Sequence, residues 1–377
     1  MAAIAVLVAT LGAFTLNGGF LYPANAFRLD QLGYSTSVIG AMGAVGACGY
    51  VAGSVMAPFL AGWLGLRRAA ILSILGTAAL IFAFAIVPPI LAWYPMRLVH
   101  GITTTVLYVC GETALIAIAP AELRGRIIGF YTAVNSLFFV AGPGVVALLG
   151  FASVLPYGLV AITVGLLAFP MAFLSSVTPE LPTVPLRRLM TSVASIPALL
   201  AAVALWGWLD GSVINLFGIY AVKRGATVAD AALLFSLGPL GNVILQFPIG
   251  WLADHVSRRV LLAGLSGTGF LLALALPFLD LSGHLIMAHL ILFGAVGFGT
   301  FTVSLIALGD ALTGTALVVA NAAFGICWGL GSFAGSAITG SLMDIVGQSG
   351  FPLALAAGFL IQCVAVITLP MQAAEVS

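Results

Sequence analysis

Polar and ionisable side chains recur between residues 97 and 112, inside an otherwise apolar stretch that reads RLVHGITTTVLYVCGE. At about 100° per residue they fall within roughly 60° on either side of one line along a helix. The side chains on this line are Arg97, His100, Thr104, Tyr108 and Glu112. Ionisable groups are costly in hydrocarbon unless water or a partner receives them, so they mark functional positions by default. We therefore predict that this stripe faces a water-filled cavity. The alternative is that Arg97 snorkels to the outer surface while Glu112 is hydrated near the inner one.

A second carboxylate, Asp210, falls past the middle of another apolar segment. A carboxyl group at such a depth can bind and release a proton inside the membrane. Our hypothesis is that Asp210 and Glu112 are the proton-linked carboxylates and that Arg97 is a charge partner or a clamp for a bound solute. A structural ion pair or an interhelical hydrogen bond would explain the same residues, since polar groups also hold membrane helices together.

Three further side chains are candidates for contact with a solute, and each has a packing alternative. Asn17 lies in the first apolar segment and could donate a hydrogen bond, although a single asparagine also suits a contact between helices. Trp206 lies about one helical turn before Asp210 on the same face and could line a pocket or pack in the core. His289 could titrate near neutral pH or be held by a hydrogen bond.

The composition defines the class of protein. Hydrophobic residues make up 62% of the 377 residues and charged residues 6%, and the mean hydropathy is +1.23. Soluble domains carry roughly one-quarter charged residues, so this is a polytopic membrane protein whose surroundings are the lipid bilayer. The net charge of +1 argues against nucleic acid as a partner. The sequence contains no HExxH, CxxC or P-loop pattern, so we expect no catalytic residues, no metal, no cofactor and no enzyme activity.

Apolar segments long enough to span a hydrocarbon core of about 30 Å recur along the whole chain. We expect twelve helices, at about residues 2–23, 37–62, 69–87, 91–119, 127–150, 154–176, 195–220, 229–250, 259–278, 283–311, 316–345 and 351–371. The long polar interruption at residues 178–194 divides them into an N-terminal bundle, 1–177, and a C-terminal bundle, 195–377.

Arginine and lysine in the loops predict the orientation. With both termini in the cytoplasm, the inner loops hold eight such residues and the outer loops three. The inner ones are Arg67, Arg68, Arg124, Arg126, Arg187, Arg188, Arg258 and Arg259, and the outer ones are Arg28, Lys223 and Arg224. Because basic residues favour the cytoplasmic side, we expect a multi-pass protein of the inner, or plasma, membrane with cytoplasmic termini.

The two halves of the chain repeat one another weakly. A shift of 191 to 193 residues carries Asn17 onto Asp210 and Arg97 onto His289. Such repeats are found in secondary transporters whose substrate site lies between the halves, near the middle of the bilayer. The fold class we predict is all-α and integral to the membrane, with two pseudo-symmetric six-helix bundles.

The segment GWLADHVSRR, residues 250–259, resembles the loop signature of the major facilitator superfamily. The resemblance implies that Gly250, Asp254, Arg258 and Arg259 form a gating loop in which the aspartate caps a helix N-terminus. Gly142 and Pro143 partly match the fifth-helix antiporter motif of that family.

Three short patterns resemble the YcaD-like branch of the superfamily. They are Glu112 followed by RGR at residues 124–126, LGD at 308–310, and GSLMD at 340–344. The resemblance implies proton-coupled or facilitated transport of a small solute. We expect a monomeric secondary transporter, proton-coupled, that works by alternating access. Two alternatives remain open, namely a flippase or drug exporter for lipids and amphipathic compounds, and a membrane sensor or assembly subunit that transports nothing.

Overall fold

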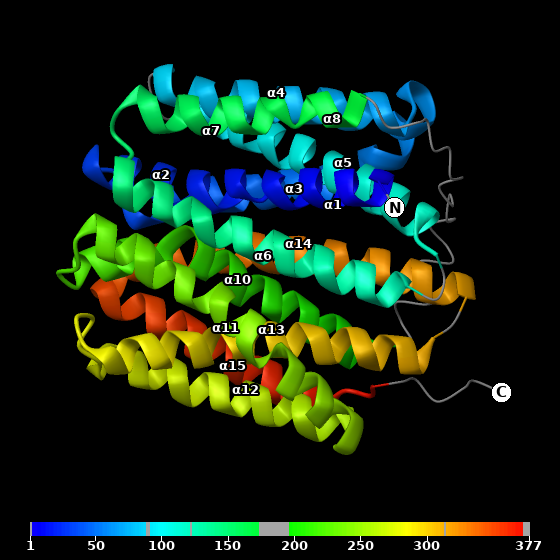
Figure 1. Ribbon diagram of the computed structural model, residues 1–377. Coiled ribbons are helices and arrows are strands. Elements are labelled where there is room, and N and C mark those ends of the chain that lie inside the picture. Colours follow the sequence, from blue (N-terminus) through cyan, green and yellow to red (C-terminus); the bar gives the residue numbers. More distant parts are fainter. Residues whose placement is uncertain (1, 88–90, 121–122, 173–195, 313, 372–377) are drawn as a thin grey trace. The chain divides into compact units, whose positions relative to one another are not determined.

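All the secondary-structure elements in the described part of the chain are helices (Figure 1). The structure is a computed structural model and describes residues 2–87, 91–120, 123–172, 196–312 and 314–371. The α-helices are α1 (Ala2–Phe14), α2 (Leu16–Gln31), α3 (Thr36–Leu64), α4 (Leu66–Ile86), α5 (Trp93–Ile118), α6 (Arg124–Leu149), α7 (Val154–Leu166), α8 (Ala168–Ala172), α10 (Pro197–Lys223), α11 (Val228–His255), α12 (Arg258–Ala275), α13 (His284–Ala311), α14 (Gly314–Val346) and α15 (Gly350–Thr368). Two short 3-10 helices, η1 (Leu276–Phe278) and η2 (Gly347–Ser349), follow α12 and α14. The linker expected at 178–194 lies outside the described residues.

Ten segments of the described chain are long and apolar enough to cross a membrane. One of them, Ala323–Thr368, contains part of α14 and all of α15, and α5 is not among the ten. Large apolar side chains such as Trp63 and Phe247, which are 78% and 83% exposed, point away from the protein interior. Such exposure suits lipid contact and would be unfavourable in water. The chain is a multi-pass membrane protein, and the number of twelve spans stays a prediction.

The first apolar segment is longer than the sequence suggested. We expected it to end near Pro23 and to be followed by a loop with Arg28, but α2 continues through both residues to Gln31. The only interruption between α1 and α2 is Thr15, whose hydroxyl lies 2.6 Å from the Gly12 carbonyl and 2.8 Å from the Asn135 carbonyl. Hydroxyl groups that bond to nearby carbonyls compete with the helical hydrogen bonds.

Contacts divide the chain into two compact units. Unit 1 is Met1–Gly33, Val45–Thr183 and Val228–Ser236, and unit 2 is Tyr34–Ala44, Val184–Thr227 and Leu237–Ser377. The first turns of α3 therefore pack with unit 2 and those of α11 with unit 1, while the rest of each helix belongs to the other unit.

The two units use the same pairs of helices. In unit 1 the extensive pairs are α2 with α6, α4 with α5, and α4 with α7. The matching pairs in unit 2, under the sequence repeat, are α10 with α14, α12 with α13, and α12 with α15. The repeat seen in the sequence therefore has a structural counterpart inside each unit.

An arginine binds the carbonyls at a helix end in each unit. Arg28, near the end of α2, donates to the Phe84 carbonyl at the end of α4 over 2.9 Å. Arg224, after α10, donates to the Leu279 carbonyl beyond the end of α12 over 3.0 Å. The carbonyls at a helix C-terminus carry partial negative charge, so a guanidinium there is favourable. Both arginines also lie over an aromatic ring, Trp93 in unit 1 and Tyr220 in unit 2.

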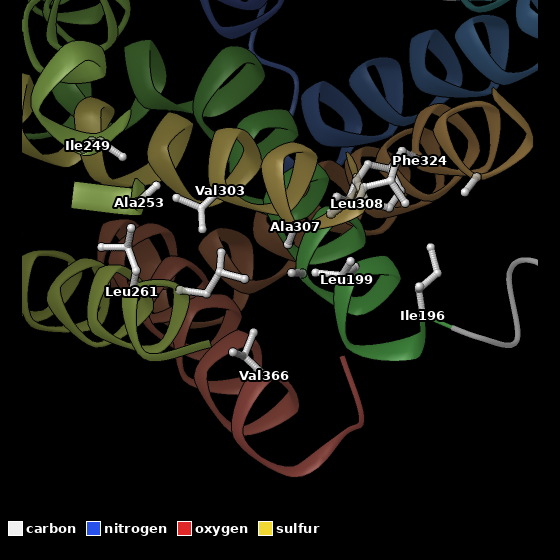
Figure 2. Close-up of a cluster of buried hydrophobic side chains, with 14 of the residues drawn as sticks. Ile196, Leu199, Ile249, Ala253, Leu261, Val303, Ala307, Leu308, Phe324 and Val366 are labelled. Atoms are coloured by element: carbon white, nitrogen blue, oxygen red, sulfur yellow. The ribbon is translucent and has the colours of Figure 1, made fainter. Parts of the chain in front are cut away.

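Glycines let α10 and α14 approach until their backbones touch. A Cβ atom at Gly331 would lie 1.7 Å from the Ala204 carbonyl oxygen, and one at Gly335 would lie 2.1 Å from that of Trp208. Small residues four apart permit this kind of close contact between membrane helices. A cluster of buried apolar side chains forms another part of the core of unit 2, and Figure 2 shows Leu199, Val303, Leu308 and others of that cluster.

A carboxylate from the end of α14 caps the start of α3 within unit 2. The Asp344 oxygens accept from the backbone N–H groups of Thr36 and Ser37, each over 2.9 Å, and from both hydroxyls. The Thr36 hydroxyl also lies 2.9 Å from the Gly340 carbonyl. N–H groups in the first turn have no partner inside their own helix, so Asp344 supplies an N-cap from a distant segment.

Candidate functional site

Arg97 lies inside unit 1 and does not reach the surface. Its side chain is 3% exposed, and its guanidinium carbon lies 4.2 Å from the centre of the Tyr22 ring. It forms no ion pair or hydrogen bond with a residue that the structure describes, and its Nη1 atom is buried without a partner. The snorkelling alternative does not describe this side chain.

Close packing of α3 on α5 fixes the position of Arg97. A Cβ atom at Gly49 would lie 2.3 Å from the Leu98 carbonyl oxygen, and one at Gly101 would lie 2.5 Å from that of Gly46. A Cβ atom at Gly46 would lie 2.9 Å from the Arg97 Nε atom. Glycine at position 46 therefore leaves the space that the guanidinium occupies.

Sequence reasoning missed two tyrosines here, one that contacts this guanidinium and a second that is hydrogen-bonded to the first. Tyr22 of α2 presents its ring to Arg97, and its hydroxyl is hydrogen-bonded to that of Tyr50 from α3. A tyrosine in an apolar helix was the only sequence signal, and nothing local to either residue indicated Arg97 as the neighbour.

His100 and Asn17 are brought together and satisfy each other. The His100 Nε2 atom lies 2.7 Å from the Asn17 Oδ1 atom, and the Asn17 amide donates to the Phe14 carbonyl over 2.8 Å. Both side chains are 1% exposed. This pair joins α5 to α2 and leaves Asn17 with little capacity to bind a solute in this state.

Glu112 lies near the other end of α5. The Tyr131 hydroxyl from α6 donates to its Oε1 atom over 2.7 Å, and its side chain is exposed. The Tyr108 ring, one turn before Glu112, packs edge-on against Phe14 with centroids 5.7 Å apart. At 1.5 Å per residue, Arg97 and Glu112 are about 22 Å apart along the helix axis, so they are not an ion pair.

Asp210 is half-buried in the middle of α10. Its Oδ2 atom accepts from the Trp328 indole nitrogen of α14 over 3.1 Å, and no cation in the described chain is paired with it. Trp206, one turn earlier, is buried and packs on Phe298 with centroids 4.8 Å apart. This contact places Trp206 in the interior of unit 2.

His289 of α13, the counterpart of Arg97 in the repeat, is also buried. Its ring stacks on Phe293 with centroids 6.3 Å apart, and its Nε2 atom has no hydrogen-bond partner. The two matching positions in the repeat therefore each hold a buried nitrogen without a partner.

The loop signature uses other residues than we expected. Asp254 is exposed at the end of α11 and has no hydrogen bond or ion pair with a described residue. Ser257 instead caps α12, by accepting from the Val260 N–H over 3.4 Å. Arg258 binds Asp310 over 2.9 Å. The partner Asp310 comes from α13, which no spacing within the loop could reveal.

The four remaining predicted positions are Arg259, Gly250, Gly142 and Pro143. Arg259 donates to the Leu369 carbonyl over 2.9 Å, after the end of α15. A Cβ atom at Gly250 would meet nothing within 4 Å, whereas one at Gly142 would lie 2.2 Å from the backbone of Gly19. Pro143 is inside α6, next to this close contact of α6 with α2.

Chemically, the described residues offer a buried guanidinium and two separate carboxyl groups, each with one neutral hydrogen-bond donor. The structure describes no group of three or more histidine, cysteine, aspartate or glutamate side chains that could hold a metal ion. The arrangement can bind charge and exchange protons, and it offers no constellation for covalent chemistry.

Comparisons with known proteins give the family. The sequence profile of the Major Facilitator Superfamily matches residues 2–336 and 210–375. The uncharacterized MFS-type transporter YfkF of Bacillus subtilis is 26% identical over 359 residues, which cover 90% of this chain and 88% of that protein. The uncharacterized MFS-type transporter YcaD of Escherichia fergusonii is 24% identical over 305 residues, covering 78% of this chain and 77% of that protein.

Among solved structures, an aspartate-to-alanine variant of the nucleoside transporter NupG has the same fold. It superposes with a TM-score of 0.81 over 97% of this chain and 99% of that chain, at 14% identity. The presence of YcaD among the relatives agrees with the resemblance found in the sequence. These relatives are transporters and not enzymes. The chain belongs to the major facilitator superfamily, and its activity is transport across a membrane.

Proposed function

We propose that this chain is a proton-coupled secondary transporter of a small solute that works as a monomer by alternating access. Twelve helices form two bundles, residues 1–177 and 195–377, joined by a cytoplasmic loop at 178–194. Both termini lie in the cytoplasm, and the membrane is the inner, or plasma, membrane. Family membership and the repeated helix pairs of the two units support this architecture.

The environment of Asp210 is the observation that carries the proposal. A carboxylate in an ion pair resists protonation because it would lose its partner, whereas Asp210 has one neutral donor, Trp328. It can therefore take up and release a proton without breaking a salt bridge. Glu112 also has one neutral donor, Tyr131, and its side chain is exposed. Proton relays in transporters use carboxyl groups of this kind.

The loop signature supplies the gate in this proposal. Arg258 and Asp310 hold α12 to α13 at one end of unit 2, and Arg259 holds the end of α15. Asp254 is exposed and available to a partner in another state of the transport cycle. Opening on one side requires that the contacts on the opposite side close, which is the role we assign to this loop.

Reconstituted vesicles test the proposal. The wild-type protein is expected to accelerate solute uptake when a pH gradient is imposed, and Asp210→Asn is expected to lose that acceleration while still exchanging solute at equal pH. The same assay on Glu112→Gln distinguishes the contribution of Glu112 to proton coupling from that of Asp210. An unchanged pH dependence in Asp210→Asn removes Asp210 from the mechanism. Movement of labelled lipid without solute flux supports the flippase, and neither movement supports the sensor or assembly subunit.

A further inference from the structure

The charge of Arg97 has no counter-ion in the part of the chain that the structure describes. Its Nη1 atom is buried without a partner, and the side chain is 97% buried, the complement of its 3% exposure. An uncompensated buried charge is strongly unfavourable, and a tyrosine ring face offsets only part of that cost. A negatively charged group that is not part of the described chain would therefore stabilise the buried charge of Arg97.

The surroundings of Arg97 hold the guanidinium in place. The Tyr22 ring covers one face, and Gly46 leaves the space beside the Nε atom. His100, which lies one turn away on the same helix, is engaged with Asn17 and does not compete for a ligand of Arg97. A guanidinium that is already positioned loses less entropy when it binds a carboxylate with two parallel hydrogen bonds.

The amount of charge indicates what kind of anion fits. Arg28, another arginine of unit 1, donates to the carbonyls of Phe84 and Ala85 and is not available for a second contact of this type. Arg97 therefore contributes one positive charge. A group with one negative charge neutralises it, whereas a phosphate dianion would leave a negative charge uncompensated.

We propose that the transported solute carries a single carboxylate, which pairs with the Arg97 guanidinium beside the ring of Tyr22. This inference rests on the proposed transport function and adds the chemical class of the solute. The hydroxyl pair of Tyr22 and Tyr50 gives the site a polar edge next to apolar ring surface. An organic monocarboxylate with an apolar body matches both features.

Thermal unfolding of the purified protein in detergent tests the site without requiring transport. The probes are a panel of aromatic and aliphatic monocarboxylates, including benzoate, with benzyl alcohol, benzylamine and phenyl phosphate as matched compounds of other charge. At least one monocarboxylate is expected to raise the unfolding temperature in a saturable way, and its matched alcohol and amine are not. A rise with phenyl phosphate alone would assign a phosphate instead and overturn the carboxylate.

Substitutions of Arg97 give the decisive comparison. Arg97→Met is expected to abolish the response to carboxylate and not to lower the unfolding temperature of the free protein, because it removes an unpaired buried charge. Arg97→Lys keeps the positive charge but loses the pair of parallel N–H donors of the guanidinium. Carboxylate binding is therefore expected to weaken about tenfold to a hundredfold. Lys223→Met, which removes an exposed positive charge at the end of α10, is the matched control and keeps the response.

The outcomes separate this inference from the proposed function. Carboxylate binding that depends on Arg97 without any flux in vesicles leaves the site standing and overturns the transport proposal. Flux of a neutral solute that is unchanged in Arg97→Lys overturns the site and leaves transport standing. A free Arg97→Met protein of clearly lower unfolding temperature, or a panel in which no monocarboxylate stabilises the wild type, also overturns the site.

Discussion

The cap that Asp344 places on α3 gives a quantitative prediction for Asp344→Asn. The substitution keeps the size of the side chain but replaces one acceptor oxygen with an NH2 group and removes the negative charge. The lost N-cap bond is worth about 1 kcal/mol, and the lost charge at a helix N-terminus about 0.3–1 kcal/mol. The side chain is exposed, so water limits the electrostatic part. The sum is about 1–2 kcal/mol, a factor of about 5–30 in the local opening equilibrium.

Hydrogen exchange followed by mass spectrometry measures this opening directly. Peptides that contain the N–H groups of Thr36 and Ser37 are expected to exchange faster in Asp344→Asn by that factor, with little change elsewhere in α3. Asp310→Asn is the control, because Asp310 is also exposed and lies near the end of a helix but pairs with Arg258. Unchanged exchange at the start of α3 would refute the idea that Asp344 holds this turn.

Three other predictions follow from particular contacts. Gly331→Leu is expected to prevent correct packing of α10 on α14 and to abolish a folded fraction in size-exclusion chromatography, whereas Gly250→Ala, which meets nothing within 4 Å, elutes as the wild type. A double-mutant cycle with Asn17→Leu and His100→Leu is expected to give a coupling free energy of about 1 kcal/mol in unfolding; additive effects contradict the hydrogen bond. Arg258→Gln is expected to change the free energy of unfolding by less than about 1 kcal/mol, because the ion pair is exposed; a larger loss in denaturant titration means that it is not screened.

The sequence was sufficient for the class, the helical character and the regions of most helices. Long apolar runs with few charges can form little else in a bilayer, so the composition alone predicted a polytopic helical protein. The prediction was wrong at the start of the chain because Pro23 was taken as an end, whereas a membrane helix can include a proline when its neighbours compensate the missing hydrogen bond.

Contacts between side chains that are far apart in the sequence could not be predicted from sequence patterns. The stripe on α5 predicted which residues share a helix face, but not that Tyr22 would cover Arg97 or that Asn17 would take up His100. The role of Asp344 depends on Thr36, which lies in a different region of the chain. Periodicity gives the direction of a side chain on its own helix, and the partner comes from packing.

The most direct test of the central claim is to follow the pH inside vesicles that contain the protein while solute enters. With a pH-sensitive dye enclosed and no imposed gradient, solute added outside is expected to shift the internal pH at a rate proportional to solute uptake, toward acid for symport and toward alkaline for antiport. Asp210→Asn is expected to remove the shift. Solute uptake by the wild type with no change of internal pH would contradict proton coupling.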